Sequence, residues 1–147
     1  MKILLPLLFV PVLASARIGE TPEECAKRYG AGEKVDAVRT VYRQAGLNVM
    51  VTFWEGKAAM IFYSKIGKSP LGQPEAMSAA EQEAVLQSNS GGSKWMIKSE
   101  EIALMKMEWA TEDGKLTAQH DGKKSYLGIM TAPFAKHLAA ARKQREK

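Results

Sequence analysis

Residues 37–64 (AVRTVYRQAGLNVMVTFWEGKAAMIFYS) decide the fold. Side chains in residues 37–44 alternate in a way that suits a half-buried strand. Residues 47–54 are rich in β-branched and aromatic side chains, which favour strands, and one face is formed by Leu47, Val49, Val51 and Phe53. Residues 58–64 form a third strand. The turn at Ala45-Gly46 and the turn at Glu55-Gly56-Lys57 join the three into successive hairpins.

Helix-start signals lie on both sides of this block. Thr21-Pro22-Glu23-Glu24 is a capping box with proline at the first helical position, and its helix runs to about Tyr29 before Gly30. Ser78 and Glu81 form a second capping box, 57 residues after the first, for a helix that runs to about Ser88. The loop at residues 66–76 is rich in Gly and Pro and indicates a boundary between two halves.

The second half repeats this pattern. A short strand is predicted at residues 94–97 and a longer one at residues 102–111. The turn at Asp113-Gly114 predicts a hairpin to residues 116–120, and residues 126–131 close the sheet. A basic C-terminal helix opens at Pro133, with one face formed by Phe134, Leu138 and Ala141.

The predicted fold class is therefore α+β. We expect an antiparallel sheet of five to seven strands with helices on one face. Two α-β-β-β halves are an open alternative, because the pattern repeats without residue-by-residue identity between the halves.

The first sixteen residues predict export. Met1-Lys2 is a short positive region, an apolar run follows at residues 3–13, and Ala14-Ser15-Ala16 fits a signal-peptide cleavage site. The alternative is a membrane anchor, but a bilayer-spanning helix needs about 20 residues. We therefore expect residues 17–147 to form one exported domain, periplasmic or secreted.

Composition excludes several classes of function. The single cysteine, Cys25, allows neither an intrachain disulfide nor a multi-thiolate metal site, and two histidines cannot form a three-histidine site. No cofactor or metal is expected. Residues 17–135 hold fifteen basic and fifteen acidic side chains, so the net charge of +5 comes mainly from the tail. No nucleic-acid partner is expected from this distribution.

The basic tail has four interpretations. Its charges are Lys136, Arg142, Lys143, Arg145 and Lys147, with Glu146 opposing them. They could contact an acidic protein, anionic lipid or another polyanion, or they could belong to a solvated, frayed helix.

Several segments resemble known families. Residues 17–30 (RIGETPEECAKRYG), 51–57 (VTFWEGK) and 108–115 (EWATEDGK) resemble small exported bacterial proteins of unknown function. Residues 18–24 are also similar to SmpA/OmlA and β-lactamase-inhibitor-like α+β modules. That resemblance implies a helical segment packed on an antiparallel sheet, and a role in envelope assembly or protein inhibition. The chain departs from the envelope lipoproteins because no lipid-bearing cysteine follows the cleavage site.

Catalytic candidates are few. A hydrolase would have to use Cys25 or His120, but no Cys–His–Asn signature surrounds the thiol. His120 and Asp121 are adjacent on a strand and should point to opposite faces. The carboxylates Glu108, Glu112 and Asp113 cluster around a hairpin, without a sign of the cleft that a glycosidase needs.

We therefore expect a non-enzymatic binding or structural protein that acts by protein contact. An inhibitor-like or envelope-assembly module is the first alternative, and the hydrolase is the second. The sheet face not covered by helices is the expected interface. Candidate interaction residues are Trp54, Trp95, Trp109, Lys136, Arg142, Lys143 and Arg145. The tryptophans, at strand positions, equally suit core packing.

Overall fold

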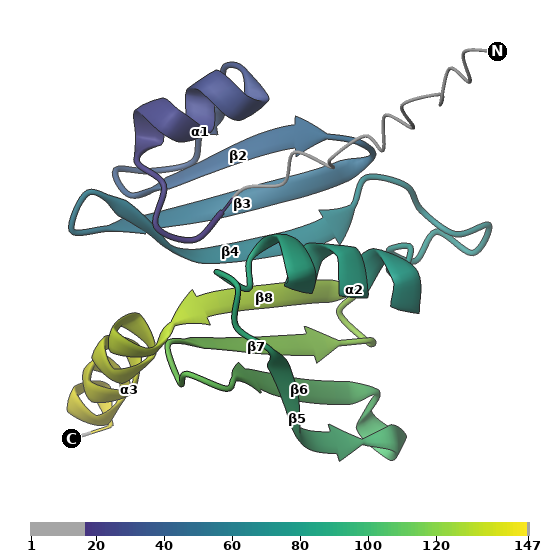
Figure 1. Ribbon diagram of the computed structural model, residues 1–147. Coiled ribbons are helices and arrows are strands. Elements are labelled where there is room, and N and C mark those ends of the chain that lie inside the picture. Colours follow the sequence, from purple (N-terminus) through teal and green to yellow (C-terminus); the bar gives the residue numbers. More distant parts are fainter. Residues whose placement is uncertain (1–16, 147) are drawn as a thin grey trace, which may run out of the picture.

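The computed structural model in Figure 1 describes residues 17–146, so the predicted signal peptide lies outside the described residues. The elements in chain order are α1 (Pro22–Tyr29), β1 (Glu33–Lys34), β2 (Arg39–Gln44), β3 (Leu47–Trp54), β4 (Lys57–Lys65), α2 (Ala79–Ser88), β5 (Trp95–Glu101), the 3₁₀ helix η1 (Ile102–Leu104), β6 (Lys106–Thr111), β7 (Leu116–Asp121), β8 (Tyr126–Thr131) and α3 (Ala132–Arg145).

All described strands form one antiparallel sheet. Its order is β1-β2-β3-β4-β8-β7-β6-β5, so each half is a four-stranded meander and the halves join where β4 pairs with β8. The fold class is confirmed as α+β. Residues 17–146 contain eight strands rather than the predicted five to seven. The additional strand is β1, whose two residues pair with β2 but are too few to show the alternation from which a strand is predicted.

Both predicted capping boxes are present. The Thr21 hydroxyl accepts from the Glu24 backbone N–H at 3.3 Å, and the Glu24 carboxylate accepts from the Thr21 N–H at 2.8 Å. In α2 the reciprocal pair is Ser78 with Glu81, at 3.2 and 2.7 Å. These bonds satisfy N–H groups that have no partner inside a helix, so each helix begins where its sequence predicts.

The strand predictions at residues 94–97 and 102–111 were wrong in their boundaries. The chain continues as β5 to Glu101, and a 3₁₀ turn then covers three residues that the sequence places in the next strand. Met105 follows with φ of 52°, in the left-handed region. This reversal of direction separates β5 from β6. A β-bulge between Ile97 and Ser99 also interrupts the alternation of side chains between the two faces of the sheet, from which strands are predicted.

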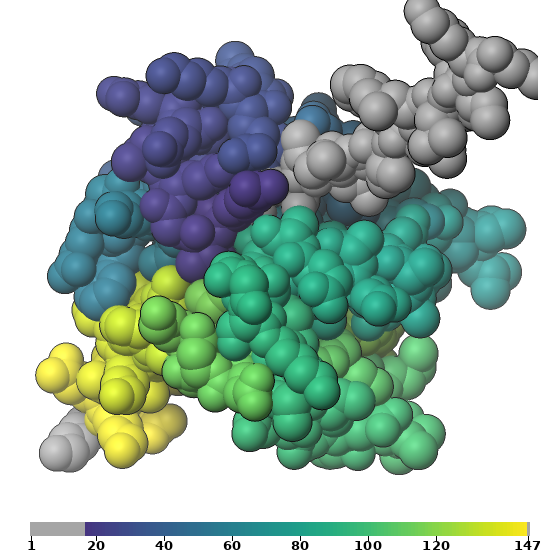
Figure 2. Space-filling view, in the orientation of Figure 1, coloured from purple at the N-terminus to yellow at the C-terminus, as the bar shows by residue number. Residues whose placement is uncertain are grey.

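The core lies between the sheet and the first two helices. Cys25 of α1 and Val85 and Leu86 of α2 pack against strand residues that all face the same side, among them Val51, Ile61, Leu127 and Ile129. Figure 2 shows α1 in purple and α2 in teal covering this side of the molecule. The third helix is the exception to the prediction of helices on one face, because α3 lies beyond the end of β8.

Candidate protein-binding surface

The opposite face of the sheet carries an apolar strip without a helix over it. Since Val49 and Val51 face the helices, the alternation of β3 places Met50 on the other side, and the strand register extends this face across the sheet. We call this set the open-face strip; all its members are half-buried, and they are Val41, Met50, Met60, Phe62, Tyr126 and Met130.

Phe62 has a fixed place in this strip. It lies opposite Gly128 of β8, where an added Cβ would stand 2.6 Å from the ring carbon Cε1 of Phe62. The ring meets Tyr126 edge-on, with centroids 5.1 Å apart and an interplanar angle of 84°. The missing side chain of Gly128 therefore lets an aromatic ring lie across the seam between the two halves.

Two shallow recesses hollow this face. The larger, of about 550 Å³, is lined by Val41, Asn48, Met50, Phe62, Ser64, Lys124 and Tyr126. The smaller, of about 250 Å³, lies over β6 and β7 and includes Lys98, Glu108, Gln119 and Met130. Arg43 is exposed next to Asn48 in the strand register, so basic groups border the larger recess.

The three tryptophans do not form one aromatic surface. Trp109 is only 8% exposed and belongs to the core. Trp95 packs against the same core, and its indole N–H donates to the Leu86 carbonyl at 2.6 Å. Trp54 stacks on His137 with centroids 5.3 Å apart and also meets Phe134 of α3. Their observed contacts are packing contacts, and an interaction role for them stays a prediction.

Helix α3 presents its basic side chains to solvent. Phe134 is buried, and Leu138 and Ala141 are half-buried on the predicted face. Lys136, Arg142, Lys143 and Arg145 are exposed on the remaining faces. The structure thus leaves these charges free to meet an anionic surface, and contact with protein or lipid through them stays a prediction.

Cys25 is placed for packing and not for nucleophilic chemistry. Its side chain has no exposed surface, and Sγ lies 3.8 Å from a carboxylate oxygen of Glu20. Glu20 also accepts from Arg28 Nε at 2.9 Å. Burial, together with the Glu20 charge, raises the pKa of the Cys25 thiol to about 12. A thiol with that pKa is protonated at neutral pH and is a poor nucleophile.

His120 and Asp121 do not form a dyad. The imidazole faces the helix-covered side, where its buried Nε2 has no hydrogen-bond partner, and burial lowers its pKa. The Asp121 carboxylate accepts from the backbone N–H groups of Lys123 and Lys124, both at 3.0 Å, and these bonds lower its pKa. Asp121 therefore stabilises a turn, as its position at the strand end predicts.

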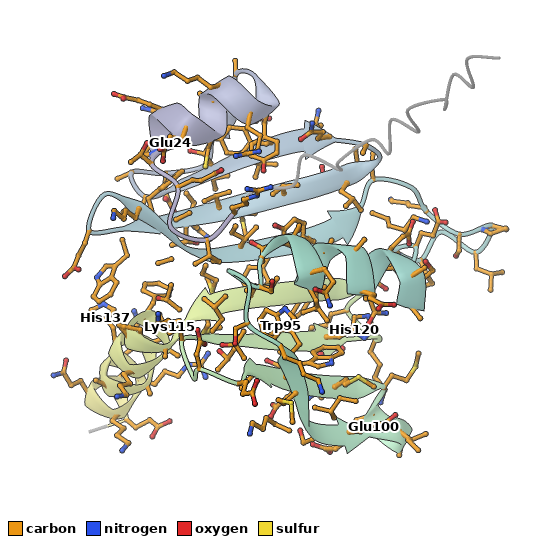
Figure 3. All side chains as sticks on the ribbon, in the orientation of Figure 1. Glu24, Trp95, Glu100, Lys115, His120 and His137 are labelled. Carbon is orange, nitrogen blue, oxygen red and sulfur yellow. The ribbon has the colours of Figure 1, made fainter. Side chains whose placement is uncertain are left out.

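The predicted carboxylate cluster is dispersed. Glu108 lies on the open face and accepts from the Ser99 hydroxyl at 3.1 Å. Asp113 accepts from the Thr111 hydroxyl at 2.7 Å within its hairpin, and Glu112 is exposed. Figure 3 shows the two labelled histidines in different parts of the molecule, with His120 near α2 and His137 on α3. Nothing in this arrangement points to paired acids across a sugar-binding cleft.

Within residues 17–146 no helix has the length and apolar character needed to cross a membrane. No protein-family model matches the chain, and no curated protein sequence matches it. Among solved structures it is similar to a cysteine-rich secretory protein from Staphylococcus aureus, with a TM-score of 0.42 and 10% sequence identity. The similarity covers 80% of this chain and 44% of that protein, so the chain spans less than half of that protein's length.

Proposed function

We propose that this chain is a small exported protein that binds another protein through the helix-free face of its sheet. The observation that supports it is the open-face strip, in which six apolar side chains lie half-buried across β2, β3, β4 and β8. Contiguous exposed apolar surface framed by polar residues is typical of protein interaction sites. The role is binding, and an inhibitor or an envelope-assembly factor would use the same surface.

The partner we propose presents apolar side chains bordered by acidic groups. Lys124 lines the larger recess and Arg43 is exposed beside it, while Lys98 lines the smaller one. Acidic groups on a partner would meet these cations as its apolar side chains fill the recesses. Such complementarity raises association rates and fixes orientation. Glu108 is the acidic exception at the smaller recess, so the larger recess is the expected centre of the contact.

The test is site-specific photo-crosslinking of residues 17–147 in the cell envelope. A benzophenone amino acid replaces Met50 in the open-face strip, and in a matched control it replaces Glu83, which is exposed on α2 on the other side of the sheet. We expect a discrete cross-linked protein from position 50 only. Equal cross-linking from both positions would contradict the proposal, because it would reflect proximity and not docking.

Charge reversal then tests the chemistry of the partner. Arg43→Glu combined with Lys124→Glu should weaken binding of the cross-linked protein by about tenfold or more, since like charges would replace opposite ones. Lys27→Glu, an exposed change on α1, is the matched control and should bind as the wild type does. If the double variant binds normally while Met50→Glu does not, the surface is correct but the acidic partner is not.

A further inference from the structure

The outer edge of the second half is unusually apolar for an exposed strand. Nine large apolar residues are exposed in the described part of the chain, and five of them lie within ten consecutive residues: Met96, Ile97, Ile102, Leu104 and Met105. Ile97 is 61% exposed and Ile102 is 82% exposed. This segment is not part of the open-face strip, because it follows the rim of the sheet along β5 and η1.

β5 also has an unpaired backbone edge. It is the last strand of the sheet and hydrogen-bonds only to β6, so the outer row of its N–H and C=O groups faces solvent. Natural proteins protect such edges, because an exposed apolar edge strand can pair with another chain. The opposite edge is protected by its size, since β1 has two residues and both are charged.

The charges along this edge are ordered. Lys94 lies just before β5, Lys98 lies at its middle, and Glu100 and Glu101 lie at its end. All four side chains are exposed, and none of them takes part in the ion pairs formed within residues 17–146. Figure 3 shows Glu100 at the outer end of the sheet, away from the helices.

We infer that the β5 edge pairs antiparallel with the β5 edge of a second copy of this chain. An antiparallel arrangement reverses one strand. With the two-fold axis between residues 97 and 98, Lys94 of each copy faces Glu101 of the other, and the symmetry makes every contact occur twice. Opposite charges on facing strands stabilise pairing, and like charges oppose it. Ile97 and Met96 become covered in the centre of the contact.

The β-bulge at Lys98 restricts this edge without closing it. The bulge divides β5 into two short stretches, and a lysine on an edge strand disfavours pairing with a neighbour that brings no carboxylate. A second copy brings Glu100 and Glu101 to the same contact. The edge therefore selects a second copy over unrelated strands, which is an interaction independent of the partner that binds the open face.

Sedimentation velocity of residues 17–147 across a concentration series tests the inference. We expect a monomer–dimer equilibrium that shifts toward monomer at high salt. The double variant Lys94→Glu/Lys98→Glu and the double variant Glu100→Lys/Glu101→Lys should each weaken dimerisation by about tenfold or more, because each places like charges opposite one another. A matched reversal on the other edge, Glu33→Lys/Lys34→Glu, should leave the dimer unchanged.

Mixing the two β5 variants gives the decisive result. One variant now has an edge that is entirely acidic and the other an edge that is entirely basic, so the mixture should form heterodimers although neither forms homodimers. Fluorophores on the two variants report this by energy transfer. A wild type that stays monomeric at all concentrations, or a dimer insensitive to either reversal, would overturn the inference. Glu100 and Glu101 line neither recess of the open face, so the dimerisation result for Glu100→Lys/Glu101→Lys is independent of the proposed function.

Discussion

The half that contains α1 ends in an edge strand of two charged residues, whereas the half that contains α2 ends in a seven-residue strand with exposed apolar side chains. Each half is otherwise a capped helix followed by a four-stranded meander. The two halves therefore share the arrangement that forms the core and the seam, whereas their edge strands differ in length and in apolar character. Differences in interaction properties are therefore expected at the rim.

The seam is where the two halves depend on each other most. Ile61 of β4 faces Ile129 of β8, and neither side chain has exposed surface. Ile61→Ala should lower the free energy of unfolding by about 2–5 kcal/mol, the range for truncating a buried aliphatic side chain. Urea unfolding followed by tryptophan fluorescence and by circular dichroism should give a single coincident transition. Two separate transitions would mean that the halves fold independently.

The other side of the seam should show a smaller effect. Gly128→Val would put a side chain where the Phe62 ring lies, with Cβ at 2.6 Å from that ring. We expect a loss of about 1–3 kcal/mol, as for overpacking. The ring should also leave the open face, which near-ultraviolet circular dichroism would report. The double variant Gly128→Val/Phe62→Ala should recover part of the loss, and a further decrease would show that the clash is not the cause.

The two helices should differ in their response to alkaline pH. Only α1 buries a thiol, whereas α2 buries Val85 and Leu86. The folded thiol has a pKa of about 12, above its ordinary value of 9.0, so above pH 9 the unfolded state releases its proton first and stability falls.

At pH 10 this loss of stability amounts to about 1 kcal/mol, because pH 10 lies one unit above the pKa of the unfolded thiol. Unfolding free energies of Cys25→Ala should therefore decline less between pH 8 and 10 than those of the wild type. Val85→Ala is the control and should decline like the wild type. Parallel curves for Cys25→Ala and the wild type would show that the thiol is not protected by the fold.

Removing the helix caps should give the smallest effect on stability, and the effect should be equal for α1 and α2. Thr21→Ala and Ser78→Ala each remove a hydroxyl that accepts a backbone N–H, and each should cost about 1 kcal/mol. Thermal unfolding of both variants measures this directly, with Glu83→Ala, an exposed change on α2, as a surface control. Clearly unequal losses would show that one helix contributes more to the cooperative unit than the other.

Much of the fold could be predicted from the sequence because its signals are local. The capping boxes, the turn at Ala45-Gly46 and the alternation in β2 and β3 concern residues that are near one another in the chain, and backbone geometry follows from them directly. The predicted strand boundary was wrong at residues 102–104. These apolar residues suggest a strand, but they form a 3₁₀ turn.

The site was less predictable than the fold. The helix-free face was expected as an interface, but its members were not named, because Met50, Phe62 and Tyr126 become neighbours only through strand register. The tryptophans were predicted as interaction residues because they are large aromatics. Trp109 lies in the core, and Trp54 packs against Phe134 of α3. Residue type alone does not report which side of a sheet a strand residue faces.

The sequence by itself determined where the helices begin, where the hairpins turn and that the sheet is antiparallel. Only the tertiary structure decided that β4 pairs with β8, and this pairing creates the seam, the open face and the exposed edge at β5. The physical reason is the separation along the chain of the residues that interact. Caps and turns are set by neighbouring residues, whereas Ile61 and Ile129 are brought together by burial of side chains from both halves, for which no short segment carries a signal.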